Sequence, residues 1–147
     1  MYAFLSGYPL TRDPGSKWEY SNVGMALLAH VITLQAKADY QSLVVQRICR
    51  PLKMDSTRLA LTDELQSRVA KGHDRLGMPL PNQDFLAMTG ASALRSTAND
   101  LLKYVGANVG LSQSSLTPLM GKTQLPRHSA PPKPRITHVG FAERRQG

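Results

Sequence analysis

A single stretch of the sequence, GSKWEYSNVG at residues 15–24, decides how the rest of the chain is interpreted. It closes a segment rich in turn-forming residues, 1–17, and leads into a run with apolar residues three or four apart. That spacing puts side chains on one helix face. Ser21 or Asn22 is suited to cap the first turn. The apolar residues of this predicted helix face are Val23, Leu27, Val31 and Leu34.

Two further helices are predicted downstream. One begins after Asp39, a good N-terminal cap, and ends near Arg50 because Pro51 follows. The other begins at Thr97, with Asp100 at the capping-box spacing, and ends at Gly110. Their predicted apolar faces are Leu43, Val44 and Ile48 in the first, and Leu101, Leu102 and Val105 in the second. Shorter helices are predicted over 64–70 and 115–120.

Composition favours a globular protein with a basic C-terminal segment. The chain has 147 residues and a net charge of +8. Residues 121–147 hold six Lys or Arg against Glu143 alone, so five of the excess charges lie there. That segment lacks interleaved aromatics, so we expect a solvated tail and no nucleic-acid partner.

Targeting signals and metal sites receive little support. No apolar run approaches the roughly 20 residues that span a bilayer, so no transmembrane segment is predicted. Residues 1–5 have no basic region and do not predict a signal peptide. Cys49 is the only cysteine, which excludes an internal disulfide. The four histidines show no metal-ligand spacing: His30, His73, His128 and His138.

Three stretches together carry a family resemblance. The first is Tyr20-Ser21-Asn22 with its flanks, the second RPLKMDST at 50–57, and the third GASALRSTANDL at 90–101. In this order they resemble the Tyr-x-Asn loop, the Pro-Leu-Gly-Met-x-x-Thr segment and the Ser-Thr-Ala-x-Asp-Leu segment of the β-lactamase-like serine hydrolases. That family includes class C β-lactamases, D-alanyl-D-alanine carboxypeptidases and related esterases. The resemblance covers roughly residues 5–120.

The resemblance implies a fold and an activity. The fold class is α+β, and the chain is expected to be a mainly helical fragment of the β-lactamase/transpeptidase-like fold. Residues 1–120 would form a partial domain with the Tyr-x-Asn motif, and 121–147 a basic, proline-containing C-terminal segment. The family transfers acyl groups through a serine and acts on β-lactams, D-alanyl peptides or esters. It implies no metal or organic cofactor. Its members usually work in the periplasm or outside the cell.

The same resemblance assigns roles to two residues. Tyr20 would transfer the proton of the nucleophilic serine, and Asn22 would hold the family's lysine and bind the amide of the substrate. An ordinary phenol has a pKa of about 10, so it can act as a base only where cations stabilise the phenolate. The alternative for Tyr20 is an aromatic side chain buried at a loop–helix junction with a local hydrogen bond.

The other two catalytic motifs of the family are not found. No serine is followed by lysine three residues later, and Lys122-Thr123-Gln124 lacks the glycine of Lys-Thr-Gly. We therefore expect the chain to cover the region between these motifs and to be inactive alone, with exposed apolar faces that favour aggregation or a complementing chain. The rival hypothesis is a non-catalytic binding module that keeps the helical scaffold.

Two lysines depart from the family pattern. Lys53 stands where relatives usually carry glycine, and Lys37 lies where relatives often have a glycine turn between helices. A positive φ at Lys53 would cost about 1 kcal/mol. Ser92, in a stretch close to a Gly-x-Ser-x-Gly elbow, lacks the second glycine and is interpreted as a turn residue.

Overall fold

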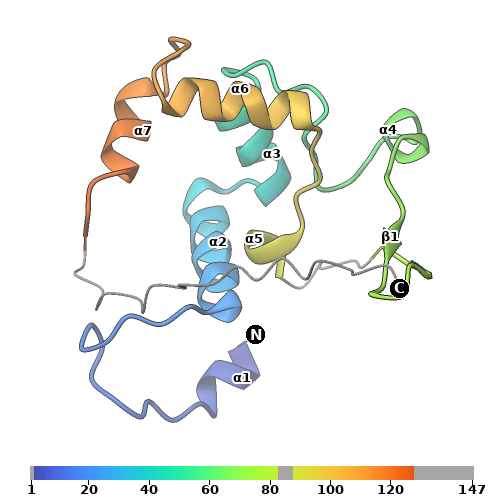
Figure 1. Ribbon diagram of the computed structural model, residues 1–147. Helices are drawn as coiled ribbons and strands as arrows, with labels where there is room; N and C mark the ends of the chain where they lie inside the picture. Colours follow the sequence, from blue (N-terminus) through green and yellow to red (C-terminus); the bar gives the residue numbers. More distant parts are fainter. Residues whose placement is uncertain (1, 83–87, 128–147) are drawn as a thin grey trace, which may run out of the picture.

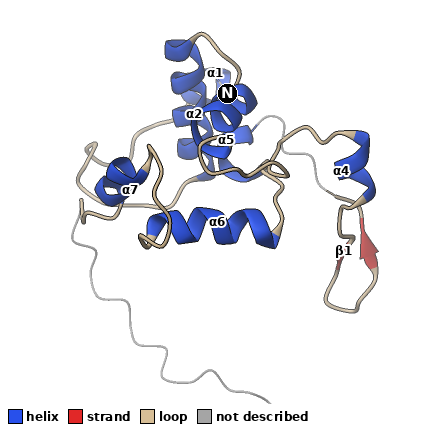
Figure 2. Cartoon of the chain, turned by 90° about the horizontal axis from the view of Figure 1, so that it is seen from above, coloured by secondary structure: helices blue, strands red, loops and turns tan. Residues whose placement is uncertain are grey.

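The protein is a set of short helices with one small hairpin, seen in Figure 1. A computed structural model describes residues 2–82 and 88–127. Segments α3, η1, α6 and α7 contribute the buried core. Helix α4 and the hairpin extend to one side, as Figure 2 shows. The elements are α1 Tyr2–Ser6, α2 Asn22–Ala36, α3 Tyr40–Val44, the π-helix η1 Val45–Cys49, α4 Asp63–Ser67, β1 Gly72–His73, β2 Pro79–Leu80, α5 Thr89–Ser92, α6 Ala98–Asn108 and α7 Thr117–Thr123.

Helix α2 begins where the sequence predicts. Ser21 has an extended backbone, and its hydroxyl accepts a hydrogen bond from the Gly24 amide at 3.0 Å. The helix ends at Lys37, whose φ of 50° is left-handed and whose amide bonds to carbonyls of the last turn. A left-handed residue is the usual device for ending a helix, and glycine usually occupies it. Lys37 therefore takes the position expected of a glycine.

The predicted face of α2 is correct only in its first half, where Val23 and Leu27 are half-buried. Val31 and Leu34 are exposed, and the buried residues are Ala26 and Ala29. These alanines lie against α5, where Gly90 comes so close that an added Cβ would stand 2.3 Å from the Ala29 Cβ. The helix is apolar on most sides, so periodicity alone could not select the face that packs. Small side chains select it, because only they permit this approach.

Helix α3 continues directly into a π-helical turn, and this changes which residue is buried. Asp39 caps α3 by accepting the Ser42 amide at 2.9 Å, as predicted. Val44 is buried, but Ile48 is 37% exposed and Cys49 takes its place at 2%. A π-turn holds one residue more than an α-turn, so the inward position moves one residue along the chain. The prediction of Ile48 in the buried stripe is therefore wrong.

The core lies between the η1 segment and the pair α6 and α7. Lys53 turns the chain there with a φ of 56°, which confirms the left-handed position suspected from the sequence. Cys49 Sγ lies 3.9 Å from the Thr57 carbonyl, and burial raises the pKa of this thiol. The buried cluster is Val44, Cys49, Leu52, Met54, Ala107 and Met120, with Tyr40 and Leu116 packed against it.

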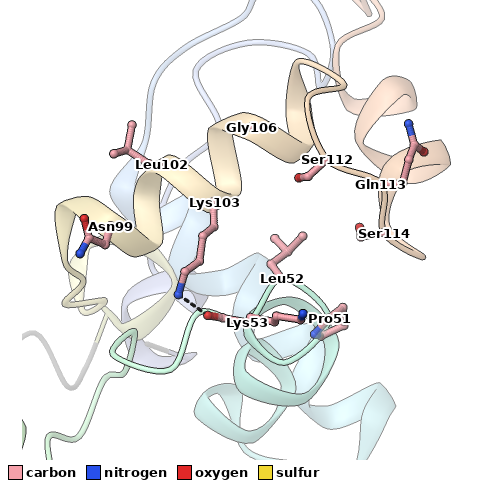
Figure 3. A pocket seen from close by; sticks show the side chains of 10 residues that line it. All are labelled: Pro51, Leu52, Lys53, Asn99, Leu102, Lys103, Gly106, Ser112, Gln113 and Ser114. Atoms are coloured by element: carbon pink, nitrogen blue, oxygen red, sulfur yellow. Dashed lines mark hydrogen bonds between the residues drawn. The ribbon is translucent and has the colours of Figure 1, made fainter.

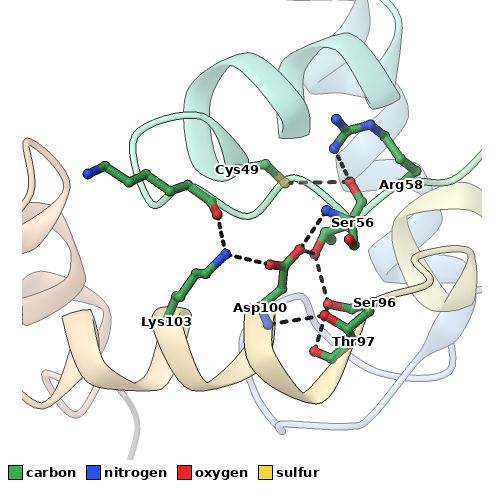
Figure 4. Close-up of polar contacts among 9 residues, drawn as sticks. Cys49, Ser56, Arg58, Ser96, Thr97, Asp100 and Lys103 are labelled. Atoms are coloured by element: carbon green, nitrogen blue, oxygen red, sulfur yellow. Dashed lines mark hydrogen bonds and ion pairs between the residues drawn. The ribbon is translucent and has the colours of Figure 1, made fainter. Parts of the chain in front are cut away.

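Helix α6 confirms one half of its predicted capping box. Thr97 accepts the Asp100 amide at 3.2 Å, and Gly110 follows the helix with a φ of 80°. The Asp100 carboxylate, however, does not return to Thr97. It is 2% exposed. Figure 4 shows it directed toward Ser56 and away from Thr97. The predicted apolar face is wrong as well, because its residues are exposed: Leu101, Leu102 and Val105.

Asp100 joins two distant segments of the chain. Its carboxylate accepts the Ser56 amide and the Thr57 hydroxyl, both at 2.9 Å, and the Lys103 ammonium at 2.9 Å. Burial alone would raise the pKa of Asp100, but the hydrogen bonds from Lys103, Thr57 and Ser56 outweigh it, so the pKa lies below its ordinary value. The second and third resemblance segments thus meet at one buried carboxylate (Figure 4).

The remaining elements are short. The helix predicted over 64–70 is α4, which ends at Ser67, and the one predicted over 115–120 is α7, which runs to Thr123. Ser92 is the last residue of α5 rather than part of a turn. In the described ranges no helix has the length and apolar character needed to span a membrane. The boundary at residue 120 stays a prediction, since residues 128–147 lie outside the description.

Candidate active site

The side chains of Tyr20 and Asn22 meet at the N-terminal end of α2. Ser21 between them has φ −146° and ψ 116°, an extended conformation. Neighbours of an extended residue point to the same side, and the residue itself points to the other. Ser21 therefore caps the helix, while the Tyr20 hydroxyl donates to Asn22 Oδ1 at 2.9 Å. The local backbone brings together the two residues that the sequence singles out.

This pair faces solvent. Tyr20 is 72% exposed, so the alternative of a buried aromatic ring is wrong, although its local hydrogen bond is present. Asn22 is exposed too, and it is the first residue of a 15-residue helix. The amides of a first helical turn carry partial positive charge, which favours an anion next to them. The Tyr20 oxygen lies beside that turn through its bond to Asn22.

An ion pair holds the loop that precedes the pair. The Arg12 guanidinium binds the Glu19 carboxylate, and this hydrogen bond, reinforced by the charge of Arg12, lowers the pKa of Glu19. Both side chains are largely exposed, so the contact contributes little to stability. Its effect is local: Glu19 is joined to the far side of the loop immediately before Tyr20. Sequence analysis missed this contact, since seven residues of loop separate the partners.

The largest hollow in the described part of the protein lies elsewhere. It measures about 730 Å³ and opens between α6 and the turn at Pro51–Lys53, as Figure 3 shows. Its lining includes Lys103, whose ammonium already binds Asp100 and the Lys53 carbonyl, and Ser114, whose hydroxyl accepts the Leu116 amide. Tyr20 and Asn22 do not line it. The hollow thus offers no base beside a free nucleophile, and the candidate site stays at α2.

The histidines do not assemble a metal site in the part of the chain that the structure describes. Across residues 2–82 and 88–127, no three His, Cys, Asp or Glu side chains are close enough to hold a metal ion. His30 Nε2 instead shares a hydrogen bond of 2.6 Å with the Tyr2 hydroxyl, and the two rings meet edge to face. His73 is exposed in the hairpin. His128 and His138 lie outside the described residues.

Two contributors to the architecture escaped sequence reasoning. Asp100 was interpreted as a capping residue, whereas it holds two segments together from inside the protein. Gly90 enters the sequence argument only as the first residue of the third resemblance stretch, whereas it allows α5 to touch α2, the helix that carries Asn22. The sequence around Asp100 and Gly90 is a weak predictor of these roles, because each role depends on partners far away in the sequence.

Comparisons with known proteins agree on the class. A family model described as Beta-lactamase matches residues 1–142. The human protein Putative beta-lactamase-like 1 is 36% identical over 102 residues, which is 69% of this chain and 20% of that protein. The Escherichia coli D-alanyl-D-alanine-carboxypeptidase/endopeptidase AmpH is 30% identical over 104 residues, or 71% of this chain and 26% of the relative. The chain therefore spans about a quarter or less of these relatives.

Solved structures show the same fold. The D-alanine carboxypeptidase AmpC from Burkholderia cenocepacia aligns with a TM-score of 0.77 at 25% identity, covering 83% of this chain and 36% of that one. A β-lactamase/D-alanine carboxypeptidase from Pseudomonas syringae gives a TM-score of 0.72 at 24% identity, covering 80% and 34%. The fold is thus a mainly helical part of the β-lactamase/transpeptidase fold, as predicted. The chain belongs to the beta-lactamase family.

Proposed function

We propose that this chain supplies the Tyr-x-Asn part of an acyl-serine hydrolase site. Tyr20 is the proton-transfer residue, and Asn22 positions a lysine and binds the amide of the substrate. The observation that carries the proposal is the 2.9 Å hydrogen bond from the Tyr20 hydroxyl to Asn22 Oδ1, formed on the exposed side of the α2 N-terminus. Family membership gives the reaction class, and this pair gives the residues.

The reaction needs a nucleophile and a group that moves the proton of that nucleophile to the leaving group. A serine hydroxyl attacks a carbonyl only when a neighbouring base accepts its proton, and the proton then passes to the leaving group. The Tyr20 oxygen would accept it as a phenolate, which requires cations supplied by the rest of the site, since in the structure the Tyr20 hydroxyl still donates its proton to Asn22. No serine of this sequence has lysine three residues later, so the nucleophile and its lysine come from outside these 147 residues.

The substrates proposed are acyl compounds that carry an amide or an ester: β-lactams, D-alanyl peptides or simple esters. Similar proteins are named as β-lactamases and D-alanyl-D-alanine carboxypeptidases. The Asn22 side chain suits such substrates, since it has both a carbonyl acceptor and an NH₂ donor. Oδ1 accepts from Tyr20 and has a second lone pair for the lysine ammonium, and the NH₂ can donate to a carbonyl of the substrate.

The isolated chain is proposed to be inactive and to need a complementing polypeptide. Helix α2 packs α5 with its alanine side, and its opposite sides expose Leu28, Val31 and Ile32 at 51%, 52% and 45%. A helix that is apolar all round belongs in the interior of a larger protein. The chain covers 36% of the Burkholderia cenocepacia structure, and the remaining two thirds of such a domain would cover these sides.

The test is covalent labelling followed by intact-mass analysis. The chain alone, incubated with a penicillin or a fluorophosphonate, is expected to gain no adduct. The chain is then combined with the portions of the Burkholderia cenocepacia relative that it does not match. An adduct is expected on that complement only when both are present. An adduct on this chain alone would overturn the need for a complement.

Substitutions then test the assigned residues. In the complemented pair, Tyr20→Phe is expected to slow adduct formation by about 100-fold, the usual scale of a lost proton-transfer group. Tyr104→Phe is the matched control, because Tyr104 is a half-exposed tyrosine on α6 whose change should leave the rate as it is. Equal rates for the two variants would contradict the role of Tyr20. A stable complex without any adduct would favour the non-catalytic binding module.

A further inference from the structure

The hairpin formed by residues 71–80 projects from the body of the protein. Strands β1 and β2 are antiparallel, with Gly72 opposite Leu80 and His73 opposite Pro79. Figures 1 and 2 both show it beyond α4, on the side away from α6 and α7. Every residue from 70 to 82 is exposed. The hairpin is therefore a protrusion whose side chains no other described residue covers.

Its tip is apolar. Leu76 is 88% exposed, the highest value among the large apolar side chains of the described residues, and Met78 is 61% exposed. Leu80 on β2 adds a third apolar side chain at 50%. Exposed apolar residues scattered singly need no explanation, but three at alternate positions of one protruding turn form a local patch.

The backbone of the tip is already hydrogen-bonded within the turn. Asp74 Oδ1 accepts the amides of Leu76 and Met78, both at 2.8 Å. The Gly77 amide donates to the Asp74 carbonyl at 3.1 Å, and the Asp74 amide donates to the Met78 carbonyl at 2.9 Å. An amide that enters a medium poor in water must find a partner, or its burial costs several kcal/mol. The amides of Asp74, Leu76, Gly77 and Met78 can therefore leave water with their partners.

Cations flank the apolar tip. Residues 68–82 contain Arg68, Lys71 and Arg75 against the single acid Asp74, a net charge of +2. The Asp74 carboxylate is bonded to two amides of the turn, so its charge is partly offset from within. All three cations are exposed. An apolar tip with cations behind it matches the layered chemistry of a bilayer surface with anionic headgroups.

We propose that the hairpin attaches the protein to anionic membrane surfaces. Leu76 and Met78 enter the boundary between headgroups and acyl chains, while Arg68, Lys71 and Arg75 bind the phosphates of anionic lipids. A lipid surface is favoured over a protein partner because the tip is convex and its apolar residues are few and unshielded. This inference stands apart from the proposed hydrolase site, since it uses none of that site's residues.

The measurement must report on the hairpin itself, because residues 121–147 carry a net charge of +5 and can bind anionic vesicles on their own. In a Trp18→Phe background, which removes the single native tryptophan, Leu76→Trp places a fluorophore at the tip. Leu111→Trp is the matched control, since Leu111 is 84% exposed and follows α6. The vesicles are phosphatidylcholine with or without phosphatidylglycerol, and a brominated lipid serves as quencher.

A blue shift and quenching at the Leu76→Trp position are expected only with phosphatidylglycerol, and neither at Leu111→Trp. Leu76→Ser should weaken vesicle binding about tenfold by removing most of an apolar side chain. Arg75→Gln should weaken it about fivefold, the effect of one cation near such a surface. Binding without any change at the Leu76→Trp position would assign attachment to the basic segment and overturn the proposal. Absence of binding would overturn it as well, and equal binding to neutral vesicles would remove the role of the cations.

Discussion

The Tyr20–Asn22 pair and the Asp100 cluster are built from the same kinds of polar side chain, yet they occupy opposite environments. Tyr20 is 72% exposed and makes one hydrogen bond to its near neighbour Asn22. Asp100 is 2% exposed and accepts three hydrogen bonds, two of them from residues more than 40 positions away. The cluster thus contributes to stability, whereas the pair is available for chemistry. Structural polar groups are buried and satisfied here, and the candidate catalytic ones are open.

The largest expected effect is at Asp100. Asp100→Ala leaves the Ser56 amide and the Thr57 hydroxyl without their carboxylate, so the free energy of unfolding should fall by roughly 3 kcal/mol. Urea denaturation followed by circular dichroism measures the change. Asp55→Ala is the matched control, because Asp55 is an exposed carboxylate in the same turn and its loss should cost less than about 0.5 kcal/mol. Equal losses of unfolding free energy in the two variants would mean that the burial of Asp100 does not add to its contribution to stability.

The contribution of Asp100 should also depend on pH. Its folded pKa lies below the unfolded value of about 3.9, so the charged form favours folding. The resulting stability is complete above about pH 4 and is lost as pH falls through the folded pKa. The difference in unfolding free energy between the native chain and Asp100→Asn should therefore narrow below pH 4. A difference that stays constant there would contradict the lowered pKa.

The next effect concerns the contact between α2 and α5. Gly90→Ala would place a Cβ 2.3 Å from the Ala29 Cβ and 2.8 Å from the Met25 carbonyl oxygen, so α5 must move. A loss of about 2 kcal/mol is expected. Gly121→Ala in α7 is the control and should raise the stability. No atom lies within 4 Å of the added Cβ, and alanine favours a helix over glycine by up to about 1 kcal/mol. Thermal denaturation of both variants checks the contrast.

A smaller gain is expected from Lys53→Gly. The left-handed φ of 56° strains lysine, and glycine adopts it freely, although glycine also makes the unfolded chain more flexible. The net result should be about 0.5 kcal/mol of added stability. Lys122→Gly, inside α7, should instead cost about 1 kcal/mol. A loss of stability in Lys53→Gly would show that its side chain makes a contact that outweighs the strain.

The smallest effect is expected at Tyr20 itself. Tyr20→Phe removes one hydrogen bond on the protein surface, so the unfolding free energy should change by less than about 0.5 kcal/mol. The measurement is the same urea titration, run beside Tyr104→Phe. A loss of 2 kcal/mol or more would mean that Tyr20 contributes to stability as Asp100 does, and would contradict the difference between the Tyr20–Asn22 pair and the Asp100 cluster.

The helix starts could be predicted from the sequence because a cap is a local interaction. The sequence offers Ser21 or Asn22 as the first cap, and Ser21 takes that role, while Asp39 and Thr97 accept the expected amides. The left-handed φ at Lys53 was suggested by the family resemblance, in which glycine usually stands at that position. The family and its fold class followed from short motifs that these local structures carry.

The buried faces could not be predicted, because they depend on distant partners. Val31 and Leu34 are apolar but have no neighbour to cover them in the described part of the protein, while Ala29 is buried because Gly90 allows contact. Cys49 is buried in place of Ile48 because the π-turn adds one residue, which the spacing of the apolar residues does not predict. The sequence singles out Tyr20 and Asn22, but it predicts neither the extended backbone at Ser21, which puts both side chains on one side, nor their exposure.

Because Cys49 is buried in the core, the rate at which its thiol reacts measures how often the core opens locally. The thiol is the single one in the sequence, it is 2% exposed, and burial raises its pKa, so the reactive thiolate is suppressed while the core is closed. Alkylation can then proceed only through openings of the η1 segment. Its rate, compared with that of the denatured chain, gives the fraction of time spent open. A complementing polypeptide that tightens the core would slow this labelling without touching the sulfur.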